Sequence, residues 1–204
     1  MKEYRFRYGD GEVVIPLDEG QVLGELQGNH VPAAASIPDT LRAALENPIG
    51  LPPLRQWTKP GERVALVISD MSRFWMRQDK VIPPLVDYLR DECGIPEDHV
   101  TIIVANGTHD GGDEKELRTL VTDGVYDRVR VVNHDCLAKD LVYLGTTAHD
   151  TPVWINAEAA HADRVICLGA CTHHVMAGFG GGRKSILPGI SGMETICHNH
   201  AYSL

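Results

Sequence analysis

The sequence has no uninterrupted apolar run long enough to cross a membrane. A membrane helix needs roughly 20 consecutive apolar residues, whereas the apolar runs of this 204-residue chain are short, and its opening MKEYRFR lacks the apolar stretch of a signal peptide. A long basic run is also missing, and the formal net charge is −9. Nucleic acids and anionic membranes are bound by clustered Lys and Arg. We therefore expect a cytoplasmic protein that has neither a nucleic acid nor a membrane as its partner.

Motifs for disulfides and for conventional metal sites are missing as well. The chain has five cysteines at irregular spacing, without a C-x-x-C pair, and it contains no H-E-x-x-H motif or carboxylate-rich cluster. An odd, irregular set of cysteines indicates reduced thiols rather than a disulfide framework or a structural zinc site. A metal site with several protein ligands is not predicted, although a metal held mostly by a cofactor could use one histidine.

The chain does contain compact apolar runs that alternate with helix-like segments. With 43% hydrophobic residues it can bury a core. Apolar and polar residues alternate on both sides of Gly9-Asp10-Gly11, which predicts a small antiparallel hairpin over residues 4–16. Buried strands separated by helices indicate a Rossmann-like α/β fold, with a mainly parallel sheet flanked by helices. The predicted elements are strands at 64–68, 100–104, 129–132 and 165–168, helices at 38–46, 82–92 and 114–121, and extra or edge strands at 141–144 and 152–155.

Polar segments follow three of the predicted strands. They are Ser69–Arg73, Ala105–His109 and Ala170–His174. One such segment alone is more simply a polar loop with capping residues. Ligands of open α/β sheets bind beyond the carboxyl ends of the strands, so three segments at one edge favour a functional site. A histidine is the natural proton acceptor near neutral pH, and two at different strand ends could face a substrate from opposite sides, as racemisation requires.

The glycine-rich segment Gly178–Gly189 is the most informative part of the sequence. It fails both the Walker pattern and the dinucleotide fingerprint because Arg183 occupies a position where each requires a small residue. Consecutive glycines nevertheless permit close backbone approach, and Arg183 and Lys184 supply local positive charge. The segment therefore predicts a different phosphate-bearing ligand. The alternative interpretation is a flexible surface loop.

Taken together, the motifs resemble the nickel-dependent lactate racemase family. The matching elements are Asp70–Arg73, Asn106–His109, the pair His173–His174 followed by the loop 178–189, and Thr195–Ile196 leading to Asn199–His200. Their order and spacing agree with the family from the first central strand to the last residue. Phe74-Trp75 is a departure, because the family often has proline after the matched arginine, so a hydroxy acid larger than lactate is consistent with the sequence.

The resemblance implies a cofactor-binding role for the chain. In this family a nickel-pincer nucleotide, of the pyridinium-3,5-bisthiocarboxylic acid mononucleotide type, holds nickel and is covalently attached to a lysine that matches Lys184. One histidine of the protein binds nickel, and two others act as acid and base, whereas His173 has no role in this alignment. The implied cofactor-binding residues are Lys184, Asp70, Ser72, Gly180, Gly181, Gly182 and Arg183, the metal ligand is His200, and the catalytic residues are His109, His174 and Arg73.

The implied activity is racemisation or epimerisation of a small-molecule 2-hydroxy acid. The Cα hydride moves reversibly to the nickel-pincer nucleotide while one histidine removes the hydroxyl proton. Separate maturation enzymes make the cofactor in this family. Family members also have a carboxyl-terminal substrate domain, so we expect residues 1–204 to be the amino-terminal cofactor-binding domain and the missing domain to be a partner, without which this piece is inactive.

Two other functions are consistent with the same residues. A Rossmann-like module could bind a nucleotide without catalysing a reaction, and bound nucleotide without nickel would indicate it. A nucleotide-dependent phosphotransferase could bind the nucleotide phosphates through Gly180–Ser185. The mismatch to the Walker pattern and the lack of an acidic residue that would bind the metal ion disfavour this function. A purely structural role would need separate explanations for the histidines and for Lys184.

Overall fold

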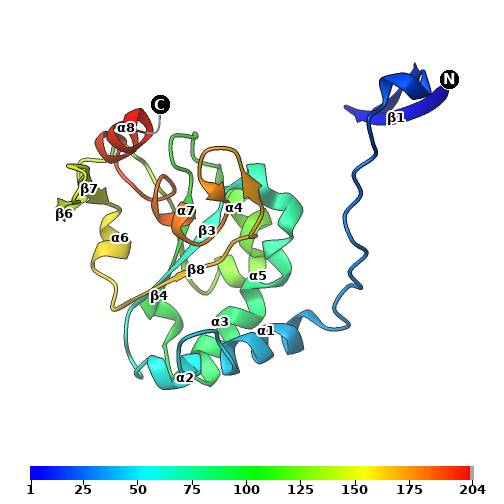
Figure 1. Ribbon diagram of the computed structural model, residues 1–204. Helices are drawn as coiled ribbons and strands as arrows, with labels where there is room; N and C mark the ends of the chain where they lie inside the picture. The colour runs from blue at the N-terminus through cyan, green and yellow to red at the C-terminus, as the bar shows by residue number, and fades with distance from the viewer. Residues whose placement is uncertain (203–204) are drawn as a thin grey trace. The chain divides into compact units, whose positions relative to one another are not determined.

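The computed structural model describes residues 1–202 and divides the chain into two compact units, Met1–Ala35 and a main unit that begins at Ser36. The ribbon is shown in Figure 1. No helix within the described part of the chain is both long and apolar enough to cross a membrane.

The first unit is the predicted hairpin. Strands β1 (Lys2–Tyr8) and β2 (Gly11–Leu17) pair antiparallel, with Tyr8 opposite Gly11. Gly9 lies in the two-residue turn with a φ of +57°, a conformation that glycine adopts without steric cost. A short 3-10 helix, η1 (Glu19–Gln21), follows.

The main unit is built on one sheet of four parallel strands. They are β3 (Val64–Ser69), β4 (Val100–Ala105), β5 (Arg130–Asn133) and β8 (Arg164–Cys167), in the spatial order β5-β4-β3-β8. The central strand β3 pairs with both β4 and β8. The strand order reverses between β3 and β8, which is the point where open α/β sheets bind ligands. The predicted α/β fold with a parallel sheet is confirmed.

Helices cover both faces of this sheet because alternate side chains of each strand point to opposite sides. From β3, Leu66 and Ile68 join a core that includes α3 and α4, whereas Ala65 and Val67 face α6 and α7. Figure 1 shows α4 and α5 on one side and α6 and α7 on the other. The α-helices of this unit up to α7 are α1 (Ile37–Glu46), α2 (Leu54–Trp57), α3 (Ile82–Asp91), α4 (Glu114–Val121), α5 (Asp123–Tyr126), α6 (Ala157–Ala160) and α7 (Arg183–Ile186).

Local sequence explains where the longer helices begin. Ser36 caps α1 by accepting a hydrogen bond from the backbone N–H of Asp39 at 3.3 Å, and Asp113 caps α4 in the same way through Glu116 at 2.9 Å. Proline lies in the first turn of α1 and of α3, where no intrahelical N–H is needed. The short 3-10 helices of this unit are η2 (Met71–Met76), η3 (Gln78–Lys80) and η4 (Glu97–His99).

The remaining elements lie outside the parallel sheet. Strands β6 (Val142–Thr146) and β7 (Pro152–Ile155) form a two-stranded antiparallel sheet of their own, so they are extra strands and not edges of the main sheet. A second ribbon pairs β9 (His173–His174) with β10 (Gly178–Phe179), and helix α8 (Met193–Tyr202) follows α7.

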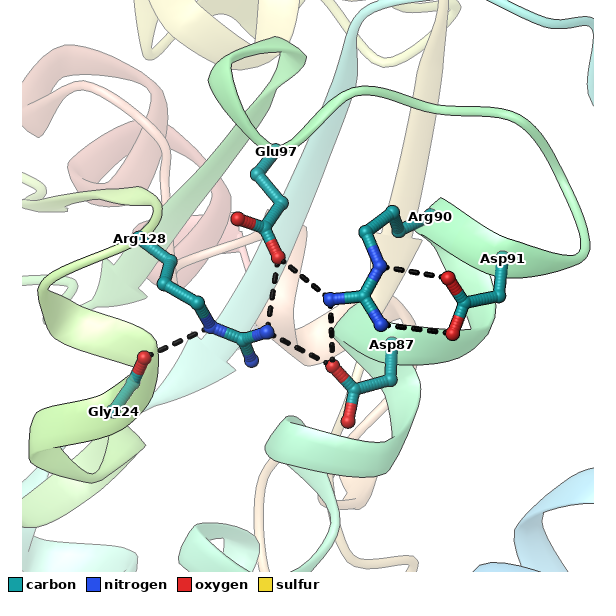
Figure 2. A network of polar contacts seen from close by, with 6 residues as sticks. All are labelled: Asp87, Arg90, Asp91, Glu97, Gly124 and Arg128. Carbon is teal, nitrogen blue, oxygen red and sulfur yellow. Dashed lines mark hydrogen bonds and ion pairs between the residues drawn. The ribbon is translucent and has the colours of Figure 1, made fainter.

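A polar network joins α3, η4 and the segment after α5, as Figure 2 shows. Arg128 donates to Asp87 at 3.0 Å and to Glu97 at 2.9 Å, and Arg90 donates to Glu97 at 3.0 Å and to Asp91 at 2.7 Å. Glu97 lies just before β4 and Arg128 just before β5, so the network is at the amino ends of these strands. It links α3, η4 and the segment before β5 at the end of the sheet opposite the carboxyl ends of the strands.

Candidate functional site

A cavity of about 310 Å³ lies at the carboxyl ends of β3, β4 and β8. Its walls come from the polar segments after these strands, from the glycine-rich loop and from α8. All but two of the predicted site residues line it. Those that do are Asp70, Ser72, Arg73, His109, His174, Gly180, Gly181, Lys184 and His200. Gly182 and Arg183 are outside the lining.

Asp70 fixes the orientation of His109. Its Oδ2 lies 2.5 Å from Nδ1 of His109, and its Oδ1 accepts hydrogen bonds from the backbone N–H of Ser72 at 3.1 Å and from the Ser72 hydroxyl at 2.5 Å. The guanidinium of Arg73 donates to the same hydroxyl at 2.9 Å. Because an ionised carboxylate only accepts, the ring proton of neutral His109 is on Nδ1. Its Nε2 therefore carries the lone pair that a general base needs.

His174 has the opposite arrangement. It lies at the end of β9, and its Nδ1 accepts hydrogen bonds from the backbone N–H groups of Met176 at 3.3 Å and Ala177 at 3.2 Å. A nitrogen that accepts carries no proton, so neutral His174 has its proton on Nε2. The neighbouring His173 lies outside the cavity lining, where its ring contacts Phe179 at a centroid distance of 5.1 Å.

The glycine-rich loop approaches the segment after β8 too closely for a side chain. A Cβ on Gly181 would lie 2.8 Å from the carbonyl oxygen of Ala170, and Gly181 has a φ of +67°. This close packing places Lys184, at the start of α7, in the cavity wall. Partial burial, together with the positive charge of Arg73, lowers the pKa of Lys184 below its ordinary value of 10.5. A larger fraction of this amine is therefore neutral and nucleophilic at a given pH.

Helix α8 brings His200 to the cavity. Nδ1 of His200 lies 3.0 Å from the carbonyl oxygen of Ile196, one turn earlier. If a proton on Nδ1 makes this hydrogen bond, Nε2 is the ring nitrogen that would bind a metal ion. Within residues 1–202, no group of three or more His, Cys, Asp or Glu side chains is placed to hold a metal. A metal ion at His200 would need its other ligands from a bound cofactor.

Sequence reasoning gave no role of its own to Asn106, although it lines the cavity. Asn106 follows β4 and is 3% exposed, and its Nδ2 donates to Asn133 Oδ1 at 3.1 Å and to the carbonyl oxygen of His134 at 3.0 Å. Its Oδ1 is buried and has no hydrogen-bond partner among the described residues. The motif Asn-Gly-Thr-His drew attention to this segment, but only the contacts around it reveal the unpaired oxygen.

Comparison with known proteins identifies the family. The sequence model for the lactate racemase N-terminal domain matches residues 8–204. The chain belongs to this family. It is 29% identical over 203 residues to a lactate racemase from Thermoanaerobacterium thermosaccharolyticum, and 31% identical over 164 residues to one from Lactiplantibacillus plantarum. These alignments cover 98% and 80% of this chain, but 47% and 38% of the two relatives.

Solved structures agree with this assignment. The lactate racemase apoprotein from T. thermosaccharolyticum has a TM-score of 0.85 and 28% identity to this chain, and the match covers 98% of this chain and 46% of that one. A protein from Thermotoga maritima, with a TM-score of 0.64 and 22% identity over 82% of this chain and 40% of its own, shows the same fold. The chain thus spans less than half the length of the curated relatives that it matches.

Proposed function

We propose that this domain holds a nickel-pincer nucleotide for a racemase or epimerase of 2-hydroxy acids. The observation that carries the proposal is that one cavity gathers His109, His174, Lys184 and His200 from four separate segments. Lys184 is the attachment point of the nucleotide, His200 binds nickel, and the two other histidines act as acid and base. The similarity to proteins named lactate racemase supports this reaction class.

The chemistry of the cavity fits such a group. A lone histidine suits a metal ion that a cofactor already holds by its own donors, and a lysine of lowered pKa suits covalent attachment through its amine. The buried, unpaired oxygen of Asn106 suits a ligand with a hydrogen-bond donor. When bound, the nucleotide would supply the acceptor for the hydride that leaves Cα of the substrate, and it would return this hydride.

The residues of the chain would move the protons and orient the substrate. His109 takes the hydroxyl proton of the substrate on Nε2, and Asp70 stabilises the imidazolium that forms. Neutral His174 presents an N–H on Nε2. To donate this proton as an imidazolium, the ring must also carry a proton on Nδ1. That proton would displace the two backbone N–H groups of the β9–β10 ribbon that donate to Nδ1. Arg73, oriented by Ser72, binds the substrate carboxylate with its remaining N–H groups.

Part of the site would come from outside this sequence. The chain covers less than half the length of the two lactate racemases. We infer that a carboxyl-terminal domain adds further substrate-binding residues and that maturation enzymes deliver the nucleotide. Trp75 and Met76 also line the cavity, so a substrate with an apolar side chain larger than the methyl group of lactate would find apolar surface there.

Nickel content tests the role given to His200. The protein is produced together with the cofactor-maturation enzymes, and nickel is measured for the wild type and for two variants, His200→Ala and His198→Ala. His198 is on the same helix but lies outside the cavity lining, and its Nδ1 is 3.2 Å from the hydroxyl of Thr151. We expect nickel in the wild type and in His198→Ala, and at least a roughly 10-fold lower content in His200→Ala.

Two results would contradict the proposal. Equal nickel in both variants would mean that His200 is not the ligand. Nucleotide bound to the wild type without any nickel would instead favour the alternative of a nucleotide-binding module that does not catalyse.

A further inference from the structure

The orientation of the Asn106 amide is fixed by a chain of hydrogen bonds. Asn133 Oδ1 accepts from the backbone N–H of Gly112 at 3.2 Å, and Asn133 Nδ2 donates to the carbonyl oxygen of Gly112 at 2.8 Å. Asn133 Oδ1 and the carbonyl oxygen of His134 both face the Asn106 amide, and both are hydrogen-bond acceptors. Both contacts require Nδ2 of Asn106, so the atom left without a partner is the oxygen.

An unpaired buried oxygen is unusual. Most buried polar atoms have a hydrogen-bond partner, and an exception indicates a strained, catalytic or ligand-binding position. Asn106 lines the cavity that holds Lys184 and His200, and its exposure is 3%. No donor among the described residues reaches its Oδ1. A ligand in this cavity that carries an O–H or N–H group would satisfy the oxygen.

The nucleotide of the proposed function, on which this inference rests, offers few donors. Its phosphate and its two acidic arms are ionised near neutral pH, so they only accept hydrogen bonds. The hydroxyl of a 2-hydroxy acid gives its proton to a histidine. In the nucleotide that has not yet been attached to Lys184, the remaining hydrogen-bond donors are thus the ribose hydroxyls. We propose that Asn106 Oδ1 accepts a hydrogen bond from a ribose hydroxyl of the bound mononucleotide and positions its pyridinium ring.

Calorimetric binding to the apoprotein tests this inference without any measurement of activity. The probe is pyridinium-3,5-dicarboxylic acid mononucleotide, which lacks sulfur, and it is compared with its 2′,3′-dideoxyribose analogue. We expect the wild type to bind the analogue roughly 5- to 10-fold more weakly, the ratio that one buried neutral hydrogen bond supplies. Asn106→Ala should bind the parent probe as weakly as the wild type binds the analogue, and it should not distinguish the two probes.

Asn133→Ala is the matched control. It removes the hydrogen bond between Asn106 and Asn133 but keeps the oxygen of Asn106, and the donation from Asn106 Nδ2 to the carbonyl oxygen of His134 still orients this oxygen. This variant should therefore still prefer the probe with ribose hydroxyls. If Asn106→Ala folds poorly, the wild type and this control still give the discrimination between the probes.

The outcomes separate this inference from the proposed function. A wild type that binds both probes equally, or an Asn106→Ala variant that prefers the hydroxyl-bearing probe as strongly as the wild type, overturns the role of Asn106 alone. A wild type that binds neither probe contradicts the nucleotide site itself, and the proposed function falls together with this inference.

Discussion

The two histidines that face the cavity have different partners on Nδ1. His109 contacts the carboxylate of Asp70, whereas His174 accepts from backbone N–H groups at the turn of the β9–β10 ribbon. The first arrangement leaves a lone pair on Nε2, and the second leaves a proton there. In the proposed reaction one histidine takes the hydroxyl proton of the substrate and the other returns a proton, so this difference matches the two proposed roles.

We predict that the two neutral rings have opposite tautomers. Long-range proton–nitrogen NMR spectra of the neutral rings at about pH 8 should show the proton of His109 on Nδ1 and that of His174 on Nε2. Asp70→Asn should turn His109 into a mixture of tautomers, whereas Asp110→Asn, next to His109 in sequence, should not. Finding both rings with the same tautomer would refute the assignment.

The sequence was sufficient to predict most of the segments that line the cavity but not the contacts within them. His109 and His174 follow predicted strands and Lys184 lies in the glycine-rich segment, whereas His200 was assigned only through the resemblance to the lactate racemase family; all four line one cavity. Their roles stay predictions. The unpaired oxygen of Asn106 could not be predicted, because it depends on hydrogen bonds to segments that lie more than 20 residues away.

At the level of elements, the parallel sheet was predictable and the ribbon next to the cavity was not. Strands such as β3 are continuous apolar runs because both faces of the sheet are covered. The β9–β10 ribbon pairs only two residues on each side and is largely exposed, so no periodic pattern marks it. Helix α8 was also missed. Its position depends on long-range contacts such as the hydrogen bond from the Trp154 backbone N–H to Thr195 Oγ1 at 2.9 Å.

The buried His134 links the end of strand β5 to the segments that follow β7 and precede α8. His134, directly after β5, is 2% exposed, its Nε2 lies 2.9 Å from the carbonyl oxygen of Ser191, and its Nδ1 lies 3.3 Å from Nδ2 of Asn156. Asn156 follows β7 and Ser191 precedes α8. Burial lowers the pKa of His134 below its ordinary value of 6.5. The folded protein thus keeps this ring neutral at a pH where the unfolded chain has already protonated it.

We predict that His134 makes the fold sensitive to acid. Its contribution to the free energy of unfolding is complete above about pH 6.5 and declines as the pH falls toward the lower pKa of the folded state, because the unfolded chain then binds the extra proton. His134→Gln should lower the free energy of unfolding by about 1–2 kcal/mol at about pH 8. Between about pH 8 and about pH 5.5 it should lose less further stability than the wild type.

Denaturant unfolding at the two pH values provides the measurement, with the exposed His161→Gln as the control. The control should follow the wild type at both values. A His134→Gln variant with the same pH dependence as the wild type would show that this ring does not titrate with unfolding.

At the level of the whole molecule, the proposed cofactor site lies at one end of the parallel sheet and a cluster of ion pairs lies at the other. The cavity lies at the carboxyl ends of the strands, and the network of Arg90 and Arg128 lies at the amino ends of β4 and β5. The domain spans less than half the length of the lactate racemases that it resembles, so we propose that the rest of the whole enzyme completes this site.

The mass of the Lys184 side chain tests the central claim most directly. The wild type, Lys184→Arg and the control Lys139→Arg are each produced with the cofactor-maturation enzymes and mapped by peptide mass under denaturing conditions. We predict a covalent mass increase on Lys184, accompanied by nickel, in the wild type and in Lys139→Arg but not in Lys184→Arg. An unmodified Lys184, in cells where a full-length lactate racemase acquires the adduct, would contradict the claim that this domain holds the cofactor.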